Sequence, residues 1–205
     1  ADTKLLKREL GVNGVMLWQF ANGLDVSAVS EMNTEPIIKS IGNSTTLPYD
    51  VSKDNDVRIT LYVLSESVSE RLRDNNFLCS TVQIGLRDKN LYSFERQGKL
   101  SFPTSSSEEI FKKAYELYRI NKPKAPLRSI SVRGCSLEGA SVRQMSCLKE
   151  FGDMQKHEAA ERAIDDIRRR FGHFSVQRGI MLTNKELSNL DPKSEHVIHP
   201  IGYLR

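Results

Sequence analysis

The stretch KSIGNSTTLPYD, from Lys39 to Asp50, holds the main clue to the fold. It has the length of a strand, but hydroxyl and amide side chains surround Gly42, whereas a core strand would alternate apolar and polar residues. Hydroxyls, a glycine and a lysine can offer hydrogen bonds and positive charge to a phosphate. The same polarity would keep an edge strand from aggregating. The stretch therefore predicts either a phosphate-binding strand or a protected edge.

The residues after this stretch show helical and extended patterns in turn. Apolar residues from Val57 to Leu72 recur on one helical face, and a second helical pattern runs from Ser105 to Tyr118. Alternating segments predict three more strands, at Leu78–Arg87, Tyr92–Phe102 and Leu127–Gly134. The order strand, helix, strand, strand, helix, strand predicts an α+β fold with two helices on one face of a four-stranded sheet. The uncovered face of that sheet would be the polar one.

Four regions are predicted along the chain. Residues 1–25 read as two short helices joined by a glycine-bearing turn, and the polar residues 26–36 read as a linker. Residues 37–138 contain the predicted sheet. Residues 139–205 form a tail, in which a helix is predicted from His157 to Phe171 and loop-rich sequence follows.

Composition limits the partners and the location of the protein. The chain of 205 residues has a formal net charge of +4, which permits a nucleic-acid partner without requiring one. No apolar run of about eighteen residues occurs, so no membrane-spanning helix is predicted, and ADTKLLKREL does not resemble a signal peptide. Three distant cysteines, Cys79, Cys135 and Cys147, argue against a disulfide framework. We therefore expect a cytoplasmic protein with no membrane partner.

Several segments together resemble one protein family. Glu9–Asp25 followed by Lys39–Thr46 is similar to the end of the thumb and the first strand of the little finger in Y-family, translesion DNA polymerases of the polymerase IV and UmuC type. IDDIRRRFG, at Ile164–Gly172, and HVIHPIGYLR, at His196–Arg205, resemble C-terminal sequence of Gram-positive members. The resemblance spans nearly the whole chain. It implies a C-terminal fragment with a partial thumb and a little finger.

The resemblance implies that the parent protein is a DNA-directed DNA polymerase, a nucleotidyltransferase that acts in repair of DNA damage. In this family, acidic palm residues hold two divalent metals, so Mg²⁺ is implied for a palm that would precede Ala1. Three acidic pairs of this chain could be suspected of the same role: Asp54 with Asp56, Glu108 with Glu109, and Asp165 with Asp166. Helix starts and solvated helical faces account for them. We therefore expect no catalytic residue, metal site or cofactor here, and no activity of the fragment alone.

The little finger of this family rests in the major groove and binds phosphates of template and primer without reading sequence. Such binding needs backbone amides, hydroxyls and a few cations. The resemblance therefore implies primer-template DNA as the partner, bound by small polar or cationic residues of the predicted strands. The candidates are Lys39, Ser40, Gly42, Asn43, Ser44 and Thr45 on the first strand, Thr81, Gln83 and Arg87 on the second, Arg96 and Lys99 on the third, and Ser129, Ser131 and Arg133 on the fourth.

The tail contains a second candidate binding segment, QMSCL. It resembles the Q-L-S-L-F type of peptide by which bacterial polymerases bind the sliding clamp, where the glutamine fills a polar subsite and the final apolar pair enters a groove. Its residues are Gln144, Met145, Ser146, Cys147 and Leu148. Such a peptide would keep a weak polymerase near the primer end by raising its effective concentration. A chance match in a loop is the alternative.

A second class of function stays open beside DNA binding. The uncovered face of a ferredoxin-like sheet can also accept a strand or surface of a partner protein. In that case the chain would be a protein-interaction module, with salt-insensitive protein binding and negligible affinity for DNA. Under the DNA interpretation we expect a monomer whose affinity falls steeply with salt.

Overall fold

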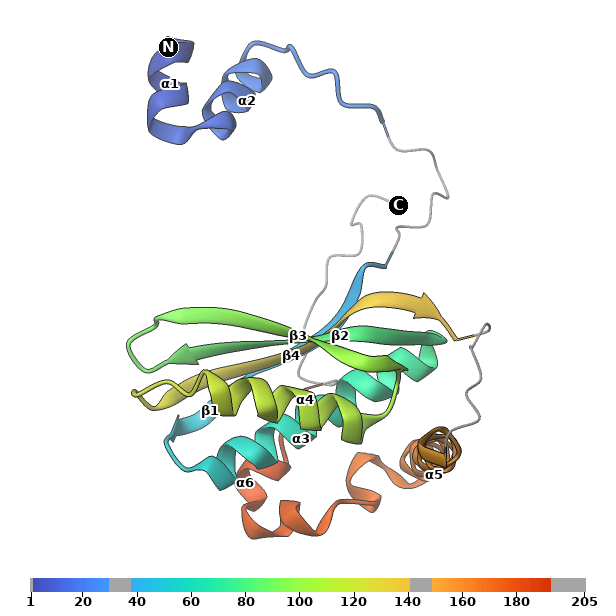
Figure 1. Ribbon diagram of the computed structural model, residues 1–205. Helices are drawn as coiled ribbons and strands as arrows, with labels where there is room; N and C mark the ends of the chain where they lie inside the picture. The colour runs from blue at the N-terminus through green and yellow to red at the C-terminus, as the bar shows by residue number, and fades with distance from the viewer. Residues whose placement is uncertain (1, 30–37, 141–148, 193–205) are drawn as a thin grey trace. The chain divides into compact units, whose positions relative to one another are not determined.

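The structure, a computed structural model, describes residues 2–29, 38–140 and 149–192, with the backbone alone for 149–155 (Figure 1). Its contacts divide the chain into two compact units, with the division between Pro36 and Ile37. The first contains the N-terminal helices and the second contains the sheet. No helix in the described ranges is long and apolar enough to cross a membrane.

The first unit is a pair of short helices, α1 (Thr3–Leu10) and α2 (Val12–Ala21). Asp2 begins α1, because its carboxylate accepts a hydrogen bond of 2.9 Å from the backbone N–H of Lys4. Gly11 ends it with φ at 62°, a left-handed conformation that glycine adopts without strain. A side chain at Gly14 would collide with the backbone carbonyl of Leu6, so glycine lets the two helices approach closely.

The second unit is built on one antiparallel sheet in the order β1-β4-β2-β3 (Figure 1). Its strands are β1 (Ser40–Val51), β2 (Phe77–Asp88), β3 (Ser93–Thr104) and β4 (Leu127–Gly139). β1 and β3 are the edges, and β4, the last strand in sequence, lies between β1 and β2.

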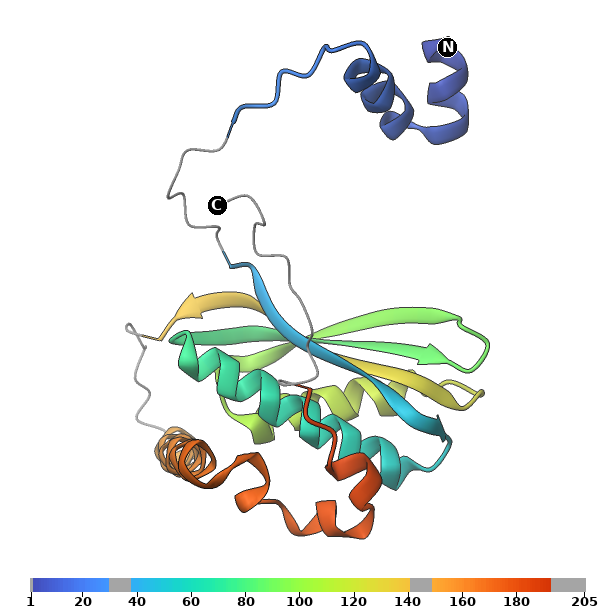
Figure 2. The same cartoon turned by 180° about the vertical axis from the view of Figure 1, so that it is seen from behind.

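Helices α3 (Asp54–Asp74) and α4 (Ser107–Ile120) cover one face of this sheet, as Figures 1 and 2 show. Ile84 of β2 and Ile130 of β4 are fully buried against Leu64 and Ile110 of the helices. Burial of each such side chain stabilises the fold by about 1.5–3 kcal/mol. The predicted α+β fold is therefore confirmed, with its strands and helices in the predicted order.

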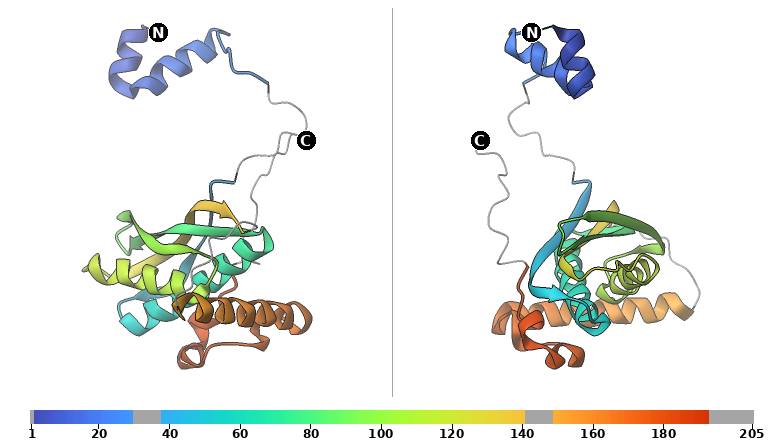
Figure 3. Two further views of the ribbon diagram at one scale, coloured as in Figure 1. Left: turned by 45° about the vertical axis from the view of Figure 1, so that its right-hand side comes forward. Right: turned by 90° about the vertical axis from the view of Figure 1, so that its left-hand side faces the viewer.

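The tail forms a third layer. Its elements are α5 (Lys149–Phe171), η1 (His173–Ser175), η2 (Gly179–Thr183) and α6 (Lys185–Ser188), and they lie on the side of α3 and α4 away from the sheet (Figures 2 and 3). Leu187 of α6 is fully buried in the same core as the sheet, and Met181 of η2 is 2% exposed. The sequence predicts loop-rich structure here, whereas short helical turns pack on α3.

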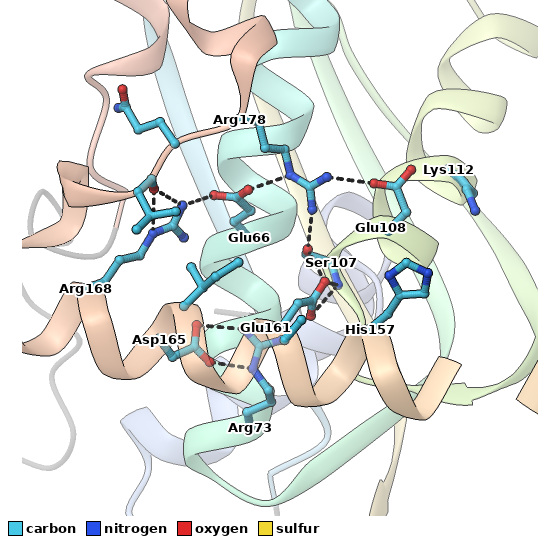
Figure 4. Close-up of a pocket in the computed structure, with 14 residues that line it drawn as sticks. Glu66, Arg73, Ser107, Glu108, Lys112, His157, Glu161, Asp165, Arg168 and Arg178 are labelled. Carbon is cyan, nitrogen blue, oxygen red and sulfur yellow. Dashed lines mark hydrogen bonds and ion pairs between the residues drawn. The ribbon is translucent and has the colours of Figure 1, made fainter. Parts of the chain in front are cut away.

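A buried ion-pair cluster joins α5 to α3 and α4 (Figure 4). The Arg73 side chain is 8% exposed, and its nitrogens donate to Asp165 Oδ2 at 2.6 Å, to Asp165 Oδ1 at 2.9 Å and to Glu161 Oε2 at 2.6 Å. Burial lowers the pKa of the Arg73 guanidinium, but the carboxylates of Asp165 and Glu161 outweigh burial and raise that pKa. The expectation that Asp165 lies on a solvated face is therefore wrong, because its carboxylate is the partner of a buried cation.

Glu161 has a second role at the start of α4. Its carboxylate accepts hydrogen bonds from the Ser107 backbone N–H at 2.9 Å and from the Ser107 hydroxyl at 2.5 Å. Ser106, at the N-cap position, makes no side-chain cap of its own. A carboxylate at this end of a helix is favoured by the unpaired N–H groups and by the helix dipole. The tail thus supplies the cap that α4 lacks locally.

A second set of ion pairs continues this contact along α3. Glu66 accepts from Arg168 of α5 at 2.8 Å and from Arg178 at 2.7 Å, and Arg178 also donates to Glu108 at 2.9 Å. Together with the Arg73 cluster they line a pocket of about 500 Å³ between α3, α4 and the tail (Figure 4). The charges along this pocket are largely paired with one another, so they bind the tail to the helices.

Candidate nucleic-acid interface

The face of the sheet opposite α3 and α4 is called here the open face. Residues directly opposite each other on antiparallel strands point to the same side, so the pairing of the strands defines rows across this face. From β1 to β3, the rows are first Ser40, Cys135, Thr81 and Lys99; second Gly42, Arg133, Gln83 and Gln97; third Ser44, Ser131, Gly85 and Glu95; and fourth Thr46, Ser129, Arg87 and Ser93.

Cations are spread over the open face. Lys99 lies in the first row, Arg133 in the second and Arg87 in the fourth, and all three are exposed. Lys39 is exposed immediately before β1. Glu95 is the single carboxylate of the four rows. The open face therefore has an excess of positive charge distributed over three strands and one strand end.

The centre of the open face is made of small polar residues. Ser129 Oγ donates to the Thr45 carbonyl at 3.0 Å, and Ser131 Oγ donates to the Gly85 carbonyl at 3.5 Å. Both hydroxyl groups therefore lie against the backbone of the sheet. A side chain at Gly85 would collide with the Ser131 hydroxyl. A hollow of about 470 Å³ results, which these residues line together with Ser44, Arg87, Ser93 and Glu95. A phosphate backbone can approach such a surface closely.

The prediction that two residues of β1, Asn43 and Thr45, lie on the open face is wrong. Asn43 and Thr45 are 3% and 6% exposed and point toward the helices. The Asn43 amide donates to Ser67 Oγ at 2.5 Å, and its oxygen accepts from Arg71 at 2.8 Å. Successive side chains of a strand point to opposite faces. The candidates Ser40 and Gly42–Thr45 of this strand therefore cannot share one face, and Ser40, Gly42 and Ser44 are those on the open side.

Arg96 is also misplaced by the sequence prediction. It lies opposite Ile84, a core residue, so its side chain leaves the sheet on the helix side. There its Nε donates to Asn121 Oδ1 at 3.2 Å at the end of α4. Lys99 is three residues further along β3 and therefore points the other way, onto the open face. The two basic residues of β3 cannot bind the same ligand on one face.

The family of the chain follows from a match to the model of one known protein family. The family model described as the impB/mucB/samB family C-terminal domain matches residues 38–147. This chain belongs to that family. The match covers the whole sheet with α3 and α4, and it also includes Gln144–Cys147 of the candidate clamp peptide, which lies outside the described residues.

Relatives of the impB/mucB/samB domain support the same conclusion. The chain is 43% identical to DNA polymerase IV of Acetivibrio thermocellus over 190 residues, which is 92% of this chain and 48% of that protein. It is 30% identical to DNA polymerase IV of Clostridium acetobutylicum over 185 residues, which is 90% of this chain and 46% of that protein. The chain thus spans about half the length of these relatives. Its resemblance to the C-terminal part of Y-family polymerases is confirmed.

A solved structure shows the same fold. The structure of a Y-family DNA polymerase chimera, Dbh-Dpo4(243-245)-Dbh, matches with a TM-score of 0.52 at 17% sequence identity, over 66% of this chain and 38% of that chain. This similarity supports the little-finger type of fold for the impB/mucB/samB domain.

Several open-face residues of this little finger were missed by the sequence prediction. They are Thr46, Ser93, Glu95, Gln97 and Cys135. Strand alternation could have found Thr46 and Cys135 from their neighbours Ser44 and Arg133. Burial raises the pKa of the Cys135 thiol, while nearby Arg133 lowers it and Glu95 raises it. Glu95 and Arg133 therefore both act electrostatically on the Cys135 thiol.

In this little finger, we expect Asn43→Ala to lower the free energy of unfolding by about 1–3 kcal/mol, because Ser67 and Arg71 would lose a buried partner. Urea unfolding measured by circular dichroism would test this. Ser44→Ala, at the exposed neighbouring position, should change the same free energy by less than about 0.5 kcal/mol. Equal effects of the two variants would contradict the internal role of Asn43.

Proposed function

We propose that residues 38–140 bind the sugar-phosphate backbone of primer-template DNA as the little finger of a translesion DNA polymerase, without reading its sequence. The observation that carries this proposal is the open face, a surface of serine, threonine and glycine residues with exposed cations in three rows. Within the sheet unit, the described helices all lie on the other side (Figure 3). The family and the DNA polymerase IV names of the relatives support it.

The chemistry of this face suits phosphates better than base edges. Arg87, Lys99 and Arg133 can each neutralise a phosphate, and such contacts supply affinity that does not depend on sequence. Gln83, which could otherwise read an adenine, donates its amide to the Glu95 carboxylate. Short hydroxyl side chains also let a DNA backbone lie close to the sheet.

The proposal is tested by reversing two charges of the open face. Fluorescence anisotropy of a labelled primer-template duplex would be followed at several salt concentrations for wild type and for Lys39→Glu/Arg133→Glu. We expect at least tenfold weaker binding at low salt, and a log-log salt slope smaller by about two, because about one unit is lost with each phosphate contact.

The control reverses two exposed cations on other elements, Arg119 of α4 and Lys185 of α6, to glutamate. This variant has the same net charge as Lys39→Glu/Arg133→Glu. If both double variants lose affinity equally, the open face is not the binding surface. Salt-insensitive capture of a protein by wild type, with no DNA binding at low salt, would instead favour a protein-interaction module.

We extend the proposal to the parent protein, which would add nucleotides to a primer with Mg²⁺ bound elsewhere. Among the described residues, no group of three or more His, Cys, Asp or Glu could hold a metal. No step of nucleotide addition is therefore assigned to them, and residues 1–205 alone should not extend a primer. The segment Gln144–Leu148 would bind the sliding clamp and hold the polymerase near the primer end.

A further inference from the structure

Glu95 is an acidic residue in a surface that we propose binds phosphates. It lies in the third row of the open face, opposite Gly85, which has no side chain to separate it from β4. Its Cγ is 3.7 Å from the position that a Cβ of Gly85 would occupy, so the side chain leans inward across the sheet. The hydrogen bond from Gln83 Nε2, in the second row, holds the carboxylate there.

The carboxylate of Glu95 makes no ion pair with the cations of the open face. The pairs within 4.0 Å in the described ranges include none between Glu95 and Arg87, Lys99 or Arg133. Its negative charge is therefore not cancelled by direct contact with a cation. It stands on the β3 side of the hollow that Ser44, Ser129 and Ser131 line on the β1 and β4 side. A phosphate in this hollow would be repelled from β3 and attracted toward Arg87.

We propose that Glu95 keeps the DNA backbone away from β3 in the third row, and that its negative charge lowers the affinity of the open face for DNA. This inference rests on the proposed DNA binding. Gln83 is a positioning residue in this arrangement, because it fixes the carboxylate over the sheet. The phosphate chain would accordingly run over β1, β4 and β2 in this part of the face. A carboxylate that repels the phosphates would let the open face release DNA faster and would leave the fold unchanged.

The test replaces Glu95 in the 205-residue chain and uses anisotropy of the same primer-template duplex. We expect Glu95→Gln to bind roughly three- to tenfold more tightly at low salt, because one repulsive charge is removed. Glu95→Lys should bind more tightly still and should steepen the log-log salt slope by about one, since a new cation reaches a phosphate. Thermal melts of both variants would show that the fold is retained.

Two controls separate local charge from other causes. Glu116→Gln and Glu116→Lys change the net charge identically at a carboxylate of α4 that is 53% exposed. Equal gains at both positions would overturn the inference in favour of net charge. Loss of the gain in Glu95→Lys/Gln83→Ala would also overturn it, since a released Gln83 amide would then be the cause. If Lys39→Glu/Arg133→Glu weakens binding but the Glu95 variants do not strengthen it, DNA binding stands and this inference fails.

Discussion

Arg73→Ala is expected to lower the free energy of unfolding of the sheet unit by roughly 3–5 kcal/mol, as for other buried ion pairs that lose one partner. The guanidinium is 8% exposed, and Glu161 and Asp165 are 12% and 6% exposed. Removing it would leave two carboxylates with little water and without their cation. Glu161 would retain its bond to the start of α4, so we expect α4 to keep this cap while the contact of Asp165 with α3 is lost.

The measurement is urea unfolding, with Arg169→Ala as the matched control. Arg169 also pairs with a carboxylate, Asp166 at 2.7 Å, but both side chains are at least 60% exposed. An exposed pair contributes about 0–1 kcal/mol, so this control should unfold almost as wild type does. A loss below about 1 kcal/mol for Arg73→Ala would show that the tail does not depend on this cluster.

Leu187→Ala is expected to cost about 2–5 kcal/mol of unfolding free energy, which is usual for a buried leucine that leaves a cavity. Leu187 is fully buried although it lies in α6, near the end of the described tail. It belongs to the core formed by the sheet, α3 and α4. The substitution therefore tests whether the tail is part of the cooperative folding unit or only lies on its surface.

Leu182→Ala makes the same chemical change in η2, where the side chain is 65% exposed. We expect a change of less than about 0.5 kcal/mol for this control. If both variants unfold like wild type, α6 does not contribute to the core. The salt slope of DNA binding should be the same for both variants under folding conditions, because the tail lies on the helix side of the sheet.

The order of the helices and strands could be predicted because each element carries its own apolar period. In β2, the alternation of Val82, Ile84 and Leu86 with Gln83 and Arg87 indicates correctly which side chains enter the core. The uncovered face follows from having only two helices for one sheet. These conclusions need no contact between distant parts of the chain.

The faces of polar residues were harder to predict. On β1, Asn43 and Ser44 are equally polar, and only the partners of Asn43 on α3, Ser67 and Arg71, show that it is buried. The ion pairs between the tail and α3 could not be predicted either, because Arg73 and Asp165 are 92 residues apart and leave no periodic pattern in the sequence. Glu95 could not be predicted as part of the site, because phosphates are bound by cations and hydroxyl groups and are repelled by a carboxylate.

The strand order β1-β4-β2-β3 also affects the time at which the protein can fold during synthesis. β4 is translated last of the four strands. It lies between β1 and β2, so each of these strands has one edge that stays without its partner until β4 is made. A ribosome adds about 5–20 residues per second, so those two strands wait on the order of seconds with unpaired edges. Helix α3 needs only local contacts and can form earlier. The polarity of β1 then protects the growing chain from association with its neighbours until β4 arrives.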